Sequence, residues 1–271
     1  VPAARWVIDG KYWTSSGTSA GTDMSLHLIK ELLGPKVMRF CWKAAEYQPN
    51  EDASFDRFPV VENAEELDTV PSECLAKVKE ISAPLRVGLV VYDQFEMLDT
   101  FGPLEMFHLC NAISGTQKMG MLFQIEVLSE DRLTAAYEGP TFESNRTFAE
   151  IKDDAPCYSI LMLPGGAGTI REIYNPSMME VLPQLIKNAG KVMTVCSGSA
   201  IIAATGLMDY KKATSNKMSF DLLRLFGPKV SWVPSARWVV DSKFYTSSGV
   251  SAGGLSRFSL PNFCCINIFS C

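Results

Sequence analysis

Four apolar runs between residues 85 and 195 place the strongest constraint on the fold of this chain. They read LRVGLVVY (85–92), FQIEVLSE (123–130), YSILMLP (158–164) and KVMTV (191–195). Helical patterns near 103–113, over 177–189 and over 219–226 alternate with them. Because parallel strands are buried on both faces and are joined by helical crossovers, this alternation predicts an α/β fold. We expect a three-layer α/β/α sandwich with a mostly parallel, flavodoxin-like central sheet.

The last apolar run leads into the turn Thr194-Val195-Cys196-Ser197-Gly198-Ser199-Ala200 and then into a helix-compatible run. A reactive side chain on such a strand-to-helix turn stands clear of the sheet at the positive end of a helix, as in a nucleophile elbow. Thiols in that position are lowered in pKa to roughly 3.5–7.5, which makes them thiolates at neutral pH. The turn alone is equally compatible with a buried structural cysteine.

A long internal repeat is the second feature of the sequence. Residues 1–21, VPAARWVIDGKYWTSSGTSAG, recur at 233–253 as VPSARWVVDSKFYTSSGVSAG, with fifteen of the twenty-one positions identical. Each copy reads as a β-hairpin with an Asp-Gly or Asp-Ser turn. We expect the tryptophans of these segments to pack in a core. Duplicated segments of this kind usually come from tandem domains.

The segment after the first copy predicts a helix over 22–45, capped by Thr22 or Asp23. Its apolar stripe consists of Met24, Leu28, Leu32 and Leu33. From Tyr47 to about Ser82 the composition is acidic and contains proline, which indicates a tail and linker with a short helix at 72–80.

Composition excludes several classes of protein. The chain has 271 residues, 47% of them hydrophobic and 20% charged, which is ordinary for a soluble globular protein. A net charge of −5 without a basic cluster argues against nucleic-acid binding, and no apolar run reaches the 18 residues of a membrane span. The eight cysteines have irregular spacing and form no CxxC pair, which disfavours zinc. With no secretory signal at the start, we expect a reduced, cytoplasmic setting.

Several segments together resemble the ThiJ/PfpI family of the class I glutamine-amidotransferase-like superfamily. They are MLDTFGPLEMF, LMLPGGAG, MTVCSGSAIIAATGLMDYKKATSN, ARWVVDSKFYTSSGVSAG and AAEYQP. The nearest branch is similar to isonitrile hydratase and to the sensor domains of some AraC-type regulators. The resemblance covers residues 85–254, and residues 1–60 resemble the carboxyl end of the same unit.

The resemblance implies a set of site residues. The family's nucleophile falls on Cys196, its acidic partner on Asp99 and a neighbouring hydroxyl on Ser197, where the hydratase branch has threonine. Oxyanion or substrate-binding positions fall on Gly165, Gly166 and Gly198, with the amides of Gly166 and Ser197 as donors. Glu105 is a second family carboxylate, which we interpret as a helix-start or packing residue. For Asp99, a helix N-cap is the competing interpretation.

The histidines of this chain restrict the chemistry. Peptidases and amidotransferases of the superfamily pair cysteine with histidine, whereas this chain has only His27 and His108. We expect His27 to be exposed and His108 to lie on the first helix of the domain, beside Cys110. Both Cys110 and Cys157 read as core residues. A Cys-His-acid peptidase or glutaminase is therefore disfavoured.

The resemblance implies a cysteine-dependent, isonitrile hydratase-like hydro-lyase that adds water to a carbon–nitrogen multiple bond, using Cys196 with Asp99. A non-catalytic ligand or redox sensor and a glyoxalase- or deglycase-type enzyme are the alternatives. We expect a small-molecule substrate, no cofactor and no metal. The expected partners include neither nucleic acid nor a membrane, and the family implies a homodimer.

These patterns divide the chain into four parts. Residues 1–60 are the carboxyl-terminal remnant of an upstream repeat, and 61–84 are a linker. Residues 85–254 form the ThiJ/PfpI-like domain, and 255–271 are an aberrant tail whose composition continues no part of the fold. Residues 1–60 could complete the domain in cis, as in a circular permutation, or by swapping with a second chain.

Overall fold

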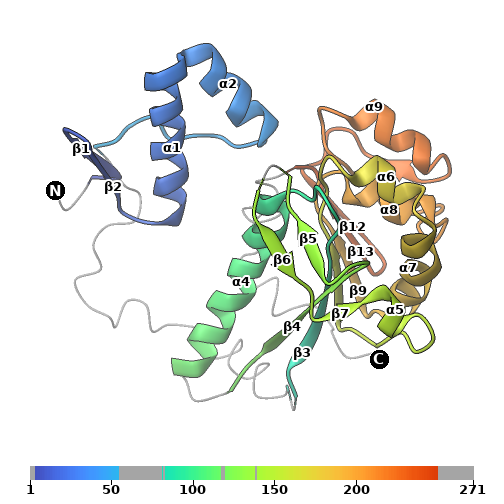
Figure 1. Cartoon of the computed structure of the whole chain (residues 1–271). Coiled ribbons are helices and arrows are strands. Elements are labelled where there is room, and N and C mark those ends of the chain that lie inside the picture. The colour runs from blue at the N-terminus through green and yellow to red at the C-terminus, as the bar shows by residue number, and fades with distance from the viewer. Residues whose placement is uncertain (1–3, 55–80, 82, 117–119, 138, 250–271) are drawn as a thin grey trace. The chain divides into compact units, whose positions relative to one another are not determined.

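The computed structural model describes residues 4–54, 81, 83–116, 120–137 and 139–249 (Figure 1). The chain divides into two compact units, Val1–Ser72 and Glu73–Cys271. The helix predicted at 72–80 and the aberrant tail at 255–271 both lie outside the described residues.

A seven-stranded sheet forms the centre of the second unit, in the order β12-β13-β9-β8-β3-β4-β7. Every neighbouring pair is parallel except β12 and β13, which form an antiparallel hairpin at one edge. The strands are β3 (Leu85–Val90), β4 (Phe123–Ser129), β7 (Arg146–Thr147), β8 (Ile160–Leu163), β9 (Lys191–Thr194), β12 (Trp238–Asp241) and β13 (Phe244–Ser247). The predicted mostly parallel sheet is confirmed.

Helices cover both faces of this sheet, α4 on one side and α5 to α8 on the other (Figure 1). They are α4 (Met97–Thr116), α5 (Phe148–Ile151), α6 (Thr169–Ile173), α7 (Pro176–Asn188), α8 (Gly198–Ala204) and α9 (Phe220–Leu223), followed by a 3-10 turn at Arg224–Phe226. Two small sheets pair β5 (Leu133–Ala135) with β6 (Thr141–Glu143) and β10 (Lys212–Ala213) with β11 (Ser231–Trp232). Within the described ranges, no helix combines the length and the apolar character that a membrane span requires.

The arrangement confirms the predicted α/β sandwich and corrects one boundary. Helix α4 begins at Met97, not near residue 103, so Asp99 lies in the first turn of the helix and not in the preceding loop. An acidic side chain is favourable there because unpaired backbone amides make the helix start positive.

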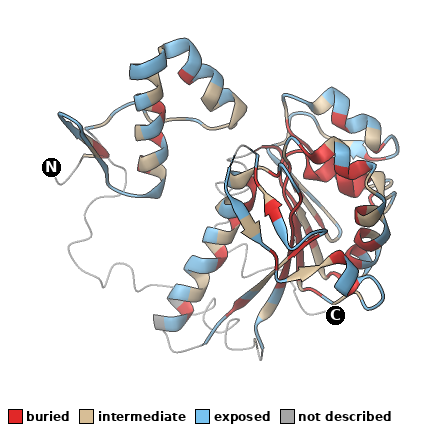
Figure 2. Ribbon diagram, in the orientation of Figure 1, coloured by how far each residue is buried: buried red, intermediate tan, exposed pale blue. Residues whose placement is uncertain are grey.

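The core of this unit is centred on β3, β8 and β9 and on the buried helix α8 (Figure 2). Gly88 in β3 shows how closely these layers pack. A Cβ added to Gly88 would lie 2.6–2.8 Å from ring atoms of Tyr158, a side chain that is fully buried. The absence of a side chain at Gly88 therefore leaves the space that the tyrosine ring fills.

Replacing Gly88 with alanine tests this packing. We expect Gly88→Ala to destabilise the protein by about 1–3 kcal/mol, because the buried ring cannot move aside without strain. Gly115→Ala is the matched control, since its added Cβ meets no atom within 4 Å and it lies in helix α4. Chemical denaturation should show the first variant destabilised and the second unchanged or slightly stabilised. Equal stabilities would contradict the packing argument.

The first unit consists of a hairpin and two helices. Strands β1 (Trp6–Asp9) and β2 (Tyr12–Ser15) pair antiparallel, and helices α1 (Thr18–Leu33) and α2 (Pro35–Ala44) follow. The single helix predicted over 22–45 is wrong: Gly34 has a φ of 88°, and the proline after it begins a new helix. The predicted cap is also wrong, because α1 begins four residues earlier, at Thr18.

Asp23 is instead the buried centre of this unit. Its Oδ2 accepts a hydrogen bond of 2.6 Å from Arg5 Nε, and its Oδ1 accepts one of 3.0 Å from the amide of Asn50. Both charged side chains are almost fully buried. A buried carboxylate is tolerated only when paired in this way, so the pair fixes α1 on the hairpin.

The face of α1 that packs is not the predicted one. The buried residues are Ala20, Asp23 and Leu26. The predicted stripe is largely open to solvent, with Leu28, Leu32 and Leu33 all exposed. Apolar periodicity alone could not reveal that an aspartate would take the inward position.

Tyr47 provides a titration test of this core. Burial raises the pKa of its phenol to about 12, with the Asp23 carboxylate adding to the rise and Arg5 opposing it. An unfolded phenol ionises near 10, so the folded unit keeps a proton between pH 10 and about 12 that the unfolded chain loses. This contribution to stability is complete below pH 10 and is lost as the pH approaches 12.

The difference in tyrosinate absorbance between wild type and Tyr47→Phe should therefore titrate near pH 12. Tyr12→Phe is the control, because this exposed phenol lies in the same unit. A Tyr47 difference spectrum that titrates near pH 10 would contradict the described burial.

Candidate functional site

Cys196 occupies the turn between β9 and α8, where sequence analysis placed a nucleophile elbow. Its φ of 58° is in the left-handed region, which is strained for a residue with a side chain. Hydrogen bonds hold this conformation. The Cys196 amide donates to the carbonyl of Ser247 at 3.1 Å, and its carbonyl accepts from the hydroxyls of Ser199 and Ser215. Hydrogen bonds to the end of β13 and to two further serines thus fix the conformation of the elbow.

Asp99 and Cys196 come together at one glycine. Asp99 is completely buried, and its Oδ2 accepts a hydrogen bond of 2.9 Å from the amide of Gly165. A Cβ added to Gly165 would lie 2.9 Å from Cys196 Cβ and 2.6 Å from the amide nitrogen of Ser197. Gly165 therefore contacts the acid through its amide and the elbow through its bare Cα.

The buried phenol of Tyr92 is influenced by both groups. Burial raises the pKa of its phenol well above the usual value, and the charges of Asp99 and Cys196 raise it further. The phenol therefore remains neutral. It donates to the carbonyl of Pro164 at 2.9 Å and is 3.1 Å from Thr169 Oγ1.

Ser197 connects the elbow to the glycine turn. Its Oγ accepts a hydrogen bond of 3.1 Å from the amide of Gly166 and lies 2.7 Å from Thr169 Oγ1. Through Thr169 it belongs to a chain of hydroxyls that ends at Tyr92. The Ser197 hydroxyl therefore binds groups of the protein itself, the amide of Gly166 and the hydroxyl of Thr169.

The predicted oxyanion glycines are placed at the site, but their amides are already engaged. Gly165 donates to Asp99, Gly166 to Ser197 Oγ and Gly198 to the carbonyl of Val195. Gly166 has a φ of 145°, which only glycine adopts readily. Its amide could reach a substrate only if the Ser197 hydroxyl turned away. The Ser197 amide, in contrast, forms no hydrogen bond with another described residue.

Some residues at the site carried no sequence signal. Tyr92, Thr169 and Ser215 contact the elbow or its partners from distant parts of the chain, and single hydroxyls of this kind are common everywhere. Glu96 is a further case. It is half-buried, burial raises its pKa, and its amide donates to the carbonyl of Gly165 at 2.8 Å.

The remaining candidates have surroundings of their own. Glu105 is exposed and lies well inside α4, which begins at Met97, so its interpretation as a helix-start or packing residue is wrong; His108 is exposed on the same helix, as a surface role implies. His27 is not exposed as expected; it is half-buried in the first unit, with ring centroids 5.8 Å from Trp6 and 5.9 Å from Trp13. Cys157 is exposed and not in the core. Among the described residues, no cluster of three or more histidine, cysteine or acidic side chains is arranged to hold a metal ion.

Residues 85–258 match the model of the DJ-1/PfpI family, so the chain belongs to that family. The chain is 25% identical over 171 residues to the isonitrile hydratase of Pseudomonas putida, which covers 62% of this chain and 67% of the relative. It is also similar to a THiJ/PfpI family protein from Pseudomonas syringae, at 28% identity and a TM-score of 0.54, covering 64% of this chain and 67% of that one.

A DJ-1 superfamily protein from Salmonella typhimurium has the same fold, at 17% identity and a TM-score of 0.52. That comparison covers 62% of this chain and 84% of the other chain. The match to the family model confirms the family that the motifs indicated.

Gly165→Ala tests the close packing of Gly165 against the elbow. The added methyl would overlap Cys196 Cβ and Ser197, so we expect a loss of about 1–3 kcal/mol in stability and a change of at least about tenfold in the alkylation rate of Cys196. Gly139→Ala is the matched control, because its Cβ would meet Met97 and Ala136 and not the elbow. Alkylation at the wild-type rate in Gly165→Ala would contradict the contact.

Proposed function

We propose that the protein is a cysteine-dependent enzyme that adds water across a carbon–nitrogen multiple bond, with an isonitrile as substrate and an N-substituted formamide as product. The observation that carries the proposal is the placement of a buried acid, Asp99, and a strained cysteine, Cys196, on two sides of Gly165. The name of the Pseudomonas putida relative supports the choice of substrate class.

The acid and the thiol have complementary tasks in this reaction. The terminal carbon of an isonitrile carries a lone pair and accepts a proton, which Asp99 supplies as a carboxylic acid. The resulting cationic carbon accepts the electron pair of the Cys196 thiolate, and a carbon–sulfur bond forms. The general acid thus protonates the carbon that the nucleophile then attacks.

Water then completes the turnover. Asp99, now a carboxylate, takes a proton from the attacking water while the new carbon–oxygen bond forms. The substrate nitrogen receives the other proton of that water, the carbon–sulfur bond breaks and the thiolate leaves. The formamide carries both hydrogens and the oxygen of one water molecule, and Cys196 and Asp99 return to their starting states.

The structure supports this chemistry over histidine-dependent hydrolysis. The carbonyl of Cys196 accepts hydrogen bonds from Ser199 and Ser215, and Gly165 lies between Asp99 and the elbow, whereas His108 is exposed on α4. The Ser197 amide is the donor available to stabilise negative charge that develops on the substrate.

The test is conversion of an alkyl isonitrile to its formamide, followed by proton NMR. We expect Asp99→Asn to lower the rate by about 10²–10⁴-fold, because it removes the proton donor. Cys196→Ala should reduce the rate to the uncatalysed background. Cys157→Ala, which removes an exposed thiol, should leave it unchanged.

Equal slow rates in all of these proteins would rule out the hydratase. The same variants should then be assayed with methylglyoxal, since loss of conversion on Cys196→Ala alone would favour a glyoxalase-type enzyme. Binding of ligands or oxidation of Cys196 without turnover would favour a sensor.

A further inference from the structure

Three hydroxyl groups connect the elbow to the interior of the second unit. Tyr92 Oη lies 3.1 Å from Thr169 Oγ1, which in turn lies 2.7 Å from Ser197 Oγ. Tyr92 follows β3, Thr169 begins α6 and Ser197 belongs to the elbow, so the three come from distant parts of the chain. All three residues are buried. We call this set the hydroxyl chain.

Backbone groups hold both ends of the hydroxyl chain. At one end Tyr92 Oη lies 2.9 Å from the carbonyl oxygen of Pro164, and at the other the amide of Gly166 donates to Ser197 Oγ at 3.1 Å. A carbonyl can only accept a hydrogen bond, and an amide N–H can only donate one. The backbone therefore determines in which direction the hydrogens of the chain point.

The number of hydrogens fixes the direction of every link. A phenol has one hydrogen, and Tyr92 gives it to Pro164, because two oxygens 2.9 Å apart without a hydrogen between them would repel each other. Thr169 must then donate to Tyr92, and Ser197 must donate to Thr169. Within the described ranges, neither hydroxyl has another acceptor. The hydrogen of Ser197 is thus directed toward Thr169.

The phenol of Tyr92 keeps its hydrogen, which preserves this direction. Burial is the main cause that raises its pKa well above the usual value, and the hydrogen bond that Thr169 donates opposes the rise. The charges of Asp99, Cys196 and Glu172 raise the pKa further. Tyr92 is therefore neutral throughout the pH range in which a thiol ionises, and its removal changes no charge at the site.

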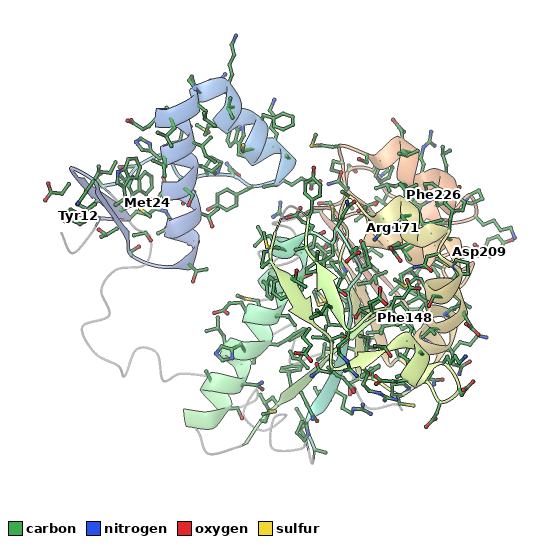
Figure 3. The ribbon with its side chains drawn as sticks, viewed as in Figure 1. Tyr12, Met24, Phe148, Arg171, Asp209 and Phe226 are labelled. Carbon is green, nitrogen blue, oxygen red and sulfur yellow. The ribbon has the colours of Figure 1, made fainter. Side chains whose placement is uncertain are left out.

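Close packing holds Thr169 beside Tyr92. A Cβ added to Gly168 would lie 2.2 Å from the carbonyl oxygen of Asp93 and 3.1 Å from the ring of Tyr92, so the start of α6 lies directly against the segment after β3. Arg171, labelled in Figure 3, donates from α6 to the same carbonyl at 2.8 Å. The contacts of two neighbouring residues therefore fix the position of Thr169.

We propose that Tyr92 is a positioning residue of the candidate site, which acts through Thr169 to keep the hydroxyl of Ser197 from donating to the sulfur of Cys196. The task of that sulfur rests on the proposed function. Ser197 Oγ and Cys196 Cβ lie 2.5 Å and 2.9 Å from the same point, the Cβ position of Gly165. A hydroxyl that turned away from Thr169 would therefore be near the thiol side chain.

A hydroxyl that donates to a thiolate makes it a weaker nucleophile. The hydrogen bond stabilises the charged form and lowers the pKa of the thiol, and the nucleophilicity of a thiolate falls as its pKa falls. In the proposed hydration, Cys196 attacks the protonated carbon of the substrate. With the hydrogen of Ser197 directed to Thr169, the thiolate keeps its nucleophilicity for that attack.

Tyr92→Phe tests the direction of the chain. It removes the acceptor of Thr169, whose hydrogen can then turn to Ser197 Oγ and release the hydrogen of Ser197 toward Cys196. We expect the pH midpoint of Cys196 alkylation by iodoacetamide to fall by about one unit, because a hydrogen bond stabilises a charged group by about that much. The limiting rate at high pH should fall about threefold. Mass spectrometry of the Cys196 peptide follows this one thiol.

Thr169→Val is the second variant, because it removes the acceptor of Ser197 while preserving the size of the side chain. It should shift the midpoint in the same direction as Tyr92→Phe. Tyr158→Phe is the matched control, since this buried phenol of the same unit donates to Glu126 and not to the hydroxyl chain. Its alkylation profile should match that of the wild type.

A double variant separates the proposal from a general loosening of the site. Once Ser197 is alanine, no hydroxyl hydrogen can turn toward the thiol, so adding Tyr92→Phe to Ser197→Ala should shift the midpoint no further. A shift of the same size with and without the Ser197 hydroxyl would overturn the proposal. Profiles of Tyr92→Phe and Thr169→Val that both superimpose on the wild type would overturn it as well.

These outcomes are independent of the hydratase assay, because alkylation requires no isonitrile. The expected shift in a protein that does not hydrate isonitriles would support the role of Tyr92 and reject the hydratase. An active hydratase without the shift would reject the role of Tyr92 alone. In an active hydratase, Tyr92→Phe should lower kcat about threefold and leave KM unchanged, because only the attack of the thiolate is weakened.

Discussion

The candidate site depends on one backbone position, Gly165. Its amide holds the buried carboxylate of Asp99, and the absence of a side chain lets Cys196 and Ser197 approach from the other side. A Cβ there would overlap Ser197 and the Cβ of Cys196. The strained φ of Cys196 is tolerated because Ser199, Ser215 and Ser247 together satisfy its amide and carbonyl.

The sequence predicts those parts of the fold that are determined by the pattern of apolar residues. Buried strands such as β3 and β8 are continuous apolar runs, and the elbow at Cys196 follows from a strand, a small-residue turn and a helix. Asp99 and Gly165 were identified through motifs of the family, and the structure brings them together. Tyr92 and Thr169 were missed because hydroxyl contacts between distant segments leave no periodic signal.

The first unit shows where pattern reasoning fails. Periodicity placed Leu28 and Leu32 inward, but the paired charges of Arg5 and Asp23 determine which face of α1 is buried. The duplicated hairpin shows a second limit of pattern reasoning. The first copy buries Trp6 on its first strand, whereas the second copy buries Phe244 on its second strand. Burial here is decided by the neighbouring element, a helix in one case and β9 in the other.

The central proposal is that Asp99 and Cys196 act together on one substrate carbon, and the pH profile of Cys196 alkylation tests the coupling between them most directly. We predict that the wild-type profile shows two coupled ionisations and that Asp99→Asn reduces them to one, because interacting groups titrate as a pair. Superimposable profiles for the two proteins would contradict the account, since the carboxyl group would then have no influence on the thiol.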